Sequence, residues 1–471
     1  MTFNIKHIIS CFCAIIALSA CSSDFLDIDP EQNVPSENAV VDIKTLQTAV
    51  NGVYSKLQSD AYYGRSMYVI PELMADNLYL SSRNTGRYLD FDNFIVNEEN
   101  TYVEDTWNAI YEVVANATKV IDGGEKLEAT TTEQQNEINQ LIGEAYAVRA
   151  LAHFDLARLF AQPYNFTAAA DHLGIPLVNT STDENISPSR NTVSEVYAQI
   201  NSDLNMAISN LTSTNNDGRF TNYAAKALAA RVAIYQDNYS NAIKYSSEVI
   251  EKGGYSLVSN ENYSDIWASE FNSESIFEII NTIADNEGTN SLGHYFDPSG
   301  YADALVTPDL YNSYDANDIR KTTVTEGSKQ GAEDNALFVF KFPEGTQYTD
   351  NIRILRLSEQ YLIRAEAYAK NNEFDKAQAD LETIMKRANP TTEDVTETGQ
   401  ALIDKIIEER RKELAFEGNR LFDLNRNKMD VSIIQGENSI EATYPNDKFI
   451  LPIPLDELNA NPNIKPQNPG Y

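Results

Sequence analysis

The sequence predicts a mainly α-helical fold in which short helices pair as hairpins, joined to an irregular, loop-rich lobe that contains short β-strands. Two observations predict the helices: apolar side chains recur at i, i+3, i+4 and i+7 over long stretches, and one hairpin-like stretch occurs twice. A third predicts the lobe, because residues 253–355 replace this period with brief β-prone runs among Asn, Asp, Gly and Thr. At 471 residues the chain is long enough to bury a large core.

The clearest hairpin is the stretch 357–387, in which each half carries one apolar stripe. Asn371 and Asn372 interrupt the helical period where a turn is needed, because Asn tolerates left-handed backbone. Ala365 and Ala377 are small enough to let the two helices cross closely. This alternation of large and small residues resembles a tetratricopeptide unit, whose single repeat cannot bury its apolar face alone. The stripes are Leu357, Tyr361, Ala365 and Tyr368 in the first half and Phe374, Ala377, Leu381 and Ile384 in the second.

Other stretches supply the partners that such a unit needs. Aligning Ala365 with Ala230 also pairs Ala377 with Ala242, so residues 230–250 form a second copy. Two further runs with helical periods, residues 144–160 and 193–211, predict one more pair.

Three more helices are expected near the two ends of the chain. The helices are residues 41–59, residues 103–121 with Trp107 on the inner face, and residues 401–416, after which Gly418 suits a C-cap. Residues 62–100 lack a sustained period and predict a shaped loop. Residues 445–471 are rich in proline, so we expect an extended strap across the helices.

The N-terminus predicts export. Lys6 and His7 precede an apolar run, residues 8–18, that is too short to span a bilayer, so residues 1–20 are typical of a signal peptide. The run ends in Leu18-Ser19-Ala20-Cys21, which resembles the lipobox of bacterial lipoproteins, in which the cysteine is acylated. We therefore expect lipidation of Cys21 and an extended leader over residues 21–40.

The composition limits which binding partners and which cysteine chemistry can be expected. With 36 basic and 70 acidic residues the net charge is -34, which argues against a nucleic-acid partner because phosphate backbones would be repelled. Of the three cysteines, Cys11 and Cys13 leave with the signal peptide, so no internal disulfide or thiolate metal site can form.

Several motifs coincide in order with those of one known family. They are DFLDIDP after Cys21, PELMADN at 71–77, RALAHFDLARLFAQPY at 149–164, GIPLV at 174–178, ERRKELAFEGNRLFDLNR at 409–426 and LPIPLDELNANPNIKPQNPGY at 451–471. Together they make the chain resemble the SusD/RagB family of outer-membrane nutrient-binding lipoproteins over nearly its whole length.

The resemblance implies one SusD-like domain over residues 41–471. It implies about four tetratricopeptide-like pairs in residues 41–252 and 356–426, with a ligand-facing lobe at 253–355. It also implies an outer-membrane protein that faces the cell surface, a non-catalytic receptor that captures oligosaccharides, or peptides as in the RagB branch, and delivers them to a SusC-like TonB-dependent outer-membrane barrel. Within the fold, the charges of the C-terminal signature are expected to pair with one another. These residues are Arg410, Arg411, Glu413, Glu417, Arg420 and Asp423.

No catalytic, metal or cofactor motif was found. GxSxG, HExxH, the P-loop and GxGxxG are all missing, and the four His residues have no metal-ligand spacing. Asp315, Asn317 and Glu326 occupy EF-hand positions 1, 3 and 12, but Ile319 and Arg320 stand where an oxygen ligand and the turn glycine belong. Structural calcium held by an irregular carboxylate cluster stays an open alternative.

Two other function classes also stay open. An α/α-type glycan-degrading enzyme would be helical and would need a pair of carboxylates, which a chain with 70 acidic residues neither locates nor excludes. A helical repeat module for protein docking would need a concave groove and no sugar platform.

We expect a neutral oligosaccharide as the ligand, because tyrosines are abundant and the net charge opposes anionic glycans. Aromatic faces cover the apolar side of a sugar ring, and nearby polar groups satisfy its hydroxyls. Two stretches offer both, and their candidate glycan-binding residues are Tyr62, Asp76, Asn77, Tyr79, Arg83 and Tyr88 in the first, with Tyr295 and Tyr301 in the second.

Overall fold

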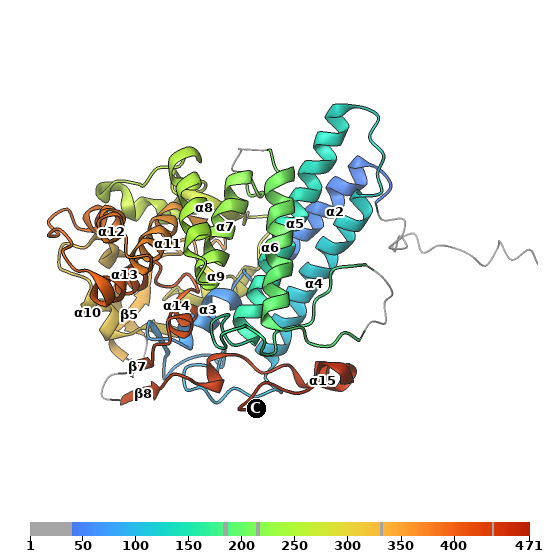
Figure 1. Ribbon diagram of the computed structural model, residues 1–471. Coiled ribbons are helices and arrows are strands. Elements are labelled where there is room, and N and C mark those ends of the chain that lie inside the picture. Colours follow the sequence, from blue (N-terminus) through green and yellow to red (C-terminus); the bar gives the residue numbers. More distant parts are fainter. Residues whose placement is uncertain (1–39, 182–186, 213–216, 330–332, 436–437) are drawn as a thin grey trace, which may run out of the picture.

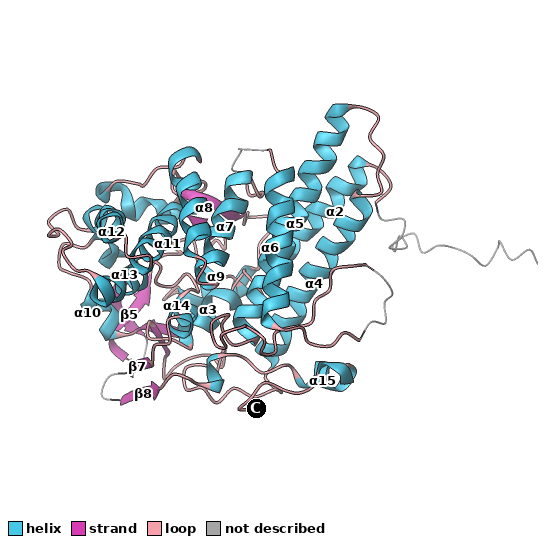
Figure 2. Ribbon diagram, in the orientation of Figure 1, coloured by secondary structure: helices cyan, strands magenta, loops and turns pink. Residues whose placement is uncertain are grey.

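The computed structural model describes residues 40–181, 187–212, 217–329, 333–435 and 438–471. Its helices stand side by side in a row, and irregular segments run beneath the lower ends of these helices (Figure 1). Among the described residues, the strands are short pieces (Figure 2). The predicted mainly α-helical fold is therefore confirmed. The signal peptide, Cys21 and the leader up to residue 39 lie outside the described residues.

In the described part of the chain, the long helices form four pairs that pack in sequence order. Each pair contacts the next, so the row has a continuous core. A further helix, α13 (Gly399–Glu413), packs on the last pair and closes the row. The pairs are α2 (Ile43–Leu57) with α4 (Thr101–Gly124), α5 (Thr132–Phe160) with α6 (Val193–Asn210), α7 (Asn222–Tyr235) with α8 (Tyr239–Lys252), and α11 (Leu357–Lys370) with α12 (Phe374–Ala388).

The two repeated hairpins turn in the same way. Asn372 after α11 and Asp237 after α7 both have left-handed backbone, with φ of 62° and 54°. Ala365 and Ala377 are fully buried at the crossing of α11 and α12, as the sequence predicted. Small residues at the crossing and a left-handed turn residue therefore set the geometry of both hairpins.

The lobe between α8 and α11 is a set of two-stranded pieces. Strand β2 (Ser275–Ile279) pairs with β6 (Ile352–Arg356), and β4 (Val324–Lys329) pairs with β5 (Glu333–Val339). Its short helices are α9 (Leu292–Phe296) and α10 (Pro308–Ser313), and one 3-10 helix spans Asn260–Ala268.

One sheet joins the lobe to the chain after α2. Strand β1 (Leu78–Leu80) pairs antiparallel with β3 (Ala304–Val306), with Tyr79 opposite Leu305. The two stretches that the sequence singled out for glycan binding therefore lie against each other.

The C-terminal segment runs beneath the lower ends of the helices (Figure 1). The Leu451 amide donates to the Leu159 carbonyl at 2.7 Å, and Asn468 donates to the carbonyls of Phe160 and Leu451. This segment therefore ties α5 in place. It begins after the short helix α14 (Arg420–Arg426) and the hairpin of β7 (Val431–Gln435) with β8 (Asn438–Ala442).

Three local predictions were wrong. Within residues 62–100 the chain forms a helix, α3 (Ser66–Leu73), which has Pro71 inside it. Gly418 does have left-handed backbone, but it lies between α13 and α14, where a side chain would collide with the Met67 carbonyl. The proline-rich tail is not extended throughout, because it contains α15 (Leu455–Ala460).

Candidate functional site

Asp76 and Asn77, two predicted glycan contacts, instead connect α3 to the C-terminal signature. Arg420 donates to both carboxylate oxygens of Asp76, at 2.7 and 2.8 Å. Arg411 donates to the Asn77 side-chain oxygen at 3.0 Å, and Asn77 is fully buried. Burial raises the pKa of Asp76, but Arg420 and Arg411 outweigh it and leave that pKa below its usual value.

The remaining charges of the C-terminal signature are also paired within the fold, as predicted. Arg410 donates to Asp423 at 2.9 Å, and Glu417 accepts from Arg356 at 2.8 Å. Glu413 is fully buried and accepts from three arginines. These contacts join the last helices to β6 and α12, so the charges stabilise the fold rather than line a surface.

Three predicted tyrosines belong to the core. Tyr62, Tyr88 and Tyr295 are fully buried. The Tyr62 hydroxyl donates to Asp155 at 2.6 Å, and Arg65 donates to the Tyr88 hydroxyl at 2.8 Å. Their prediction as glycan contacts is corrected, because no ring face is open to a ligand in this conformation.

Tyr301 is the predicted aromatic residue that stands at the centre of a partly exposed cluster. The Arg87 guanidinium lies over its ring, 3.5 Å from the centroid. The ring of His294 meets Tyr301 edge-on at 4.7 Å and Tyr348 at 5.4 Å. All four side chains are partly exposed, and we call them the Tyr301 face. Partly exposed aromatic rings with hydrogen-bond donors beside them suit a sugar ring.

Asp303 links the two chain segments that form the Tyr301 face, the segment of Arg87 and the segment of Tyr301. This fully buried carboxylate accepts from the Thr85 amide at 2.7 Å and from the Thr85 hydroxyl at 2.6 Å. Thr85 in turn accepts from Arg87. Lys329 donates to the carbonyls of Tyr301 and Ala302 at 2.9 and 2.6 Å, which fixes the backbone of the segment that carries Tyr301.

The two remaining predicted residues, Tyr79 and Arg83, lie in β1 and on the loop that follows it. Tyr79 is half-buried in β1 and packs against Leu305 and Phe338 of the lobe. Arg83 is exposed on the loop that follows β1, and its amide donates to the Ser81 hydroxyl at 3.2 Å. Both stay candidates for contact with a ligand.

Sequence reasoning missed four residues of this region: Arg87, Tyr102, His294 and Tyr348. Tyr102 stacks on Tyr88 with 4.2 Å between ring centroids and is partly exposed. Burial raises its pKa, although the charges of Arg65 and Arg87 act in the opposite direction. Arg87 could have been found, because it lies inside the first aromatic stretch. Nothing in the sequence marks Tyr348.

Near the Tyr301 face, Asp350 is an unusual buried carboxyl. Its Oδ1 accepts from the Glu344 amide at 3.0 Å, and its Oδ2 has no hydrogen-bond partner among the described residues. Burial raises its pKa to about 7, and the charge of Glu344 adds to that effect. It anchors the loop that carries Tyr348.

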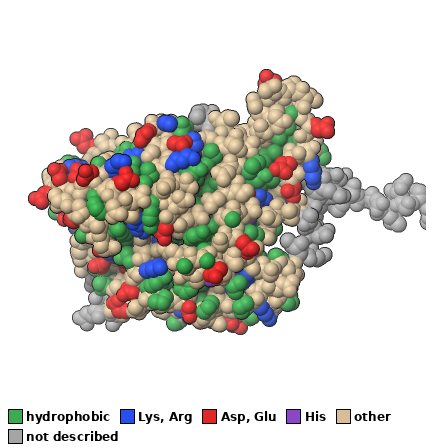
Figure 3. Space-filling view, viewed as in Figure 1, with side chains coloured by type: hydrophobic (Ala, Val, Ile, Leu, Met, Phe, Trp, Pro, Cys, Tyr) green, Lys and Arg blue, Asp and Glu red, His purple; other side chains and the backbone are tan. Residues whose placement is uncertain are grey.

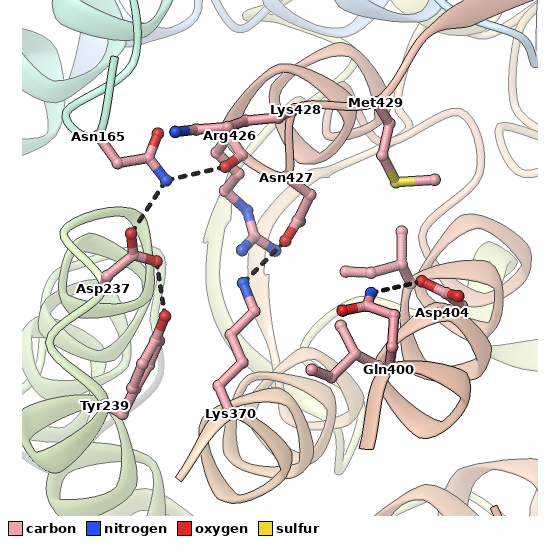
Figure 4. Close-up of a pocket in the computed structure, with 12 residues that line it drawn as sticks. Asn165, Asp237, Tyr239, Lys370, Gln400, Asp404, Arg426, Asn427, Lys428 and Met429 are labelled. Atoms are coloured by element: carbon pink, nitrogen blue, oxygen red, sulfur yellow. Dashed lines mark hydrogen bonds between the residues drawn. The ribbon is translucent and has the colours of Figure 1, made fainter. Parts of the chain in front are cut away.

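A hollow of about 290 Å³ lies where the hairpin turns meet α13 and α14, away from the Tyr301 face (Figure 4). Its polar walls are largely paired with one another: Asn165 donates to Asp237 at 2.9 Å, Lys370 to Asn427 at 2.8 Å, and Gln400 to Asp404. We assign this hollow to packing between the repeats.

Among the described residues, no group of three or more His, Cys, Asp or Glu side chains is placed to hold a metal ion, and Glu326 instead accepts from the Tyr311 hydroxyl at 2.6 Å. Within the same residues, no helix combines the length and apolar character needed to cross a bilayer. On the face shown in Figure 3, acidic and basic side chains are intermixed rather than gathered into one basic patch.

Comparison with known proteins gives consistent matches. Residues 24–234 match a family described as "Starch-binding associating with outer membrane", and residues 338–471 match the SusD family. A crystal structure of a SusD superfamily protein from Bacteroides vulgatus is similar with 30% identity and a TM-score of 0.84, over 91% of this chain and 99% of that one.

Two more similar proteins extend this result. The crystal structure of a putative sugar-binding protein from Bacteroides vulgatus has 30% identity and a TM-score of 0.83, over 92% of this chain and 100% of that one. SusD-like protein P2 of Formosa agariphila is 24% identical, over 99% of this chain and 100% of its own length. With its helical pairs, its paired C-terminal charges and these matches, the chain belongs to the SusD/RagB family.

Proposed function

We propose that this protein is a non-catalytic receptor at the cell surface that captures oligosaccharides and passes them to a SusC-like TonB-dependent barrel in the outer membrane. The observation that carries the proposal is the Tyr301 face, an aromatic platform with polar edges on the lobe of a SusD/RagB chain. The similar protein from Bacteroides vulgatus, a putative sugar-binding protein, supports the ligand class.

The location follows from the N-terminus. Lipidation of Cys21 would hold the protein at the outer membrane, and a family described as associating with that membrane supports this placement. The partner barrel completes the proposal, because a lipid-anchored receptor supplies no passage for its ligand. Neither a cofactor nor a metal is required for capture.

Two experiments test the proposal. Titration calorimetry of the purified protein with panels of oligosaccharides and of peptides should show heat for a glycan, and chromatography of the mixture should recover that glycan uncleaved. Binding of peptides alone would favour a RagB-like receptor, and shortened glycans would favour the enzyme. Extraction of the natively expressed, tagged protein in mild detergent should also recover a large barrel protein, and repeated recovery of the receptor alone would contradict the partnership.

A further inference from the structure

The Tyr301 face carries a cation whose charge is only partly compensated. Asp303 is the one carboxylate within 4 Å of Arg87 among the described residues, at 3.9 Å. Both oxygens of Asp303 already accept from Thr85, and Lys329 lies 3.8 Å from the same carboxylate. One buried acid therefore lies between two cations.

The guanidinium of Arg87 has a free edge. Nη1 donates to Thr85, while Nε and Nη2 donate to no residue in the ranges that the structure describes. The side chain is 22% exposed, and its guanidinium lies over the Tyr301 ring. Contact with the ring restricts the guanidinium, which orders its donors before a ligand arrives.

From this geometry we infer that the glycan is acidic and that its carboxylate or sulfate group binds Arg87 while its ring packs on the Tyr301 face. The inference rests on the proposed function and narrows its ligand class. A ligand that covers Arg87 removes the cation from water. Hydroxyl groups would satisfy its donors but leave its charge poorly compensated, whereas an anion supplies both charge and two acceptors in the matching planar geometry.

The expectation of a neutral ligand came from the net charge of -34. That charge acts mainly at long range. At 0.15 M salt the screening length is about 8 Å, so exposed acids on distant helices repel a bound ligand only weakly. A cation in direct contact with the ligand then has the larger effect.

Matched ligand pairs test this inference by calorimetry in 0.15 M salt. One pair is oligogalacturonate and its fully methyl-esterified form; the other is a sulfated galactan oligosaccharide and its desulfated form. The acidic member of at least one pair should bind about tenfold more tightly or better. The pair that shows the difference identifies the anion as a carboxylate or a sulfate.

Two variants locate the effect. Arg87→Met should abolish the preference for the acidic member, so that the two members of the pair bind with affinities within about twofold of each other. Lys119→Met removes one exposed cation from α4 and should keep the full preference. Circular dichroism confirms that both variants fold.

The outcomes separate the two proposals. Equal affinity for both members of each pair, or a preference that survives Arg87→Met, overturns the acidic ligand and leaves the receptor intact. Binding of other neutral glycans but of neither pair also overturns it. If the parent protein binds no glycan of any kind, the proposed function fails as well.

Discussion

Replacing Glu413 by Gln should destabilise the protein strongly, because this fully buried carboxylate is shared by Arg320, Arg356 and Arg387. Removing one partner of a buried ion pair typically costs about 3–5 kcal/mol, since the other charge stays buried without compensation. Glu274 also lies near Arg356 and Arg387, so we expect about 3 kcal/mol here, a large share of the roughly 5–15 kcal/mol that stabilises a typical domain.

The loss of unfolding free energy caused by Glu413→Gln should become smaller at low pH. Burial alone would raise the pKa of Glu413, but the three arginines lower it well below its usual value. The contribution of the carboxylate is therefore fully present above the unfolded pKa, near 4.5, and is lost as pH falls below that value. The difference between the parent and Glu413→Gln should be constant from pH 5 to 7 and shrink at lower pH.

Urea unfolding followed by circular dichroism at several pH values measures this difference. Glu373→Gln is the matched control, because Glu373 forms an exposed pair with Lys376 and should leave the unfolding midpoint unchanged. If Glu413→Gln unfolds at the same urea concentration as Glu373→Gln at pH 7, the convergent arginines do not stabilise the fold as argued.

Three further predictions concern the Tyr301 face, the buried carboxyl of Asp350 and the lipid anchor at Cys21. Tyr301→Ala should weaken glycan binding roughly three- to tenfold in calorimetry without changing the unfolding midpoint, whereas Tyr88→Ala should lower the free energy of unfolding by about 3–5 kcal/mol; the reverse pattern would contradict the placement of the site. Asp350 has a pKa raised from 3.8 to about 7, so its folded form holds a proton that the unfolded chain releases. Parent stability relative to Asp350→Asn should therefore fall as pH rises from 4 to 7, by at most about 4 kcal/mol, and parallel pH profiles would contradict the shift. Cys21→Ser should release the protein from membranes into the soluble fraction, and mass spectrometry that finds another, unmodified mature N-terminus in the parent would refute lipidation.

The helical row could be predicted because its signal is local. Each helix of a hairpin buries one face, so apolar residues recur every three to four positions, and small residues mark the crossings at Ala365 and Ala377. Helix α3 gave no such signal because every one of its residues is buried. A helix covered on all sides has no alternation of apolar and polar residues, and Pro71 inside it also argues against a helix.

The candidate site could be predicted only as two stretches of chain. Tyr88 and Tyr301 both lie on irregular backbone among polar residues, and the sequence does not distinguish them. What distinguishes them is tertiary: Tyr88 is enclosed by Tyr102 and Tyr295, while Tyr301 has Arg87 on one face and the edge of His294 beside it. Contacts between residues far apart in the chain decide which of these tyrosines is buried, and such contacts leave no pattern in the nearby sequence.

The motifs that carried the family resemblance turned out to mark the structural contacts. Asp76 and Asn77 stand in the PELMADN segment, and the fold requires them because Arg411 and Arg420 bind them. Tyr301 lies instead in residues 235–337, between the two stretches that match the family, and Arg87 lies within the first matched stretch but outside these motifs. A family that keeps one scaffold for different ligands must place its specificity where the scaffold imposes no residue. The ligand is therefore to be sought from the contacts of Tyr301 and Arg87, since the shared motifs are already occupied in holding the fold together.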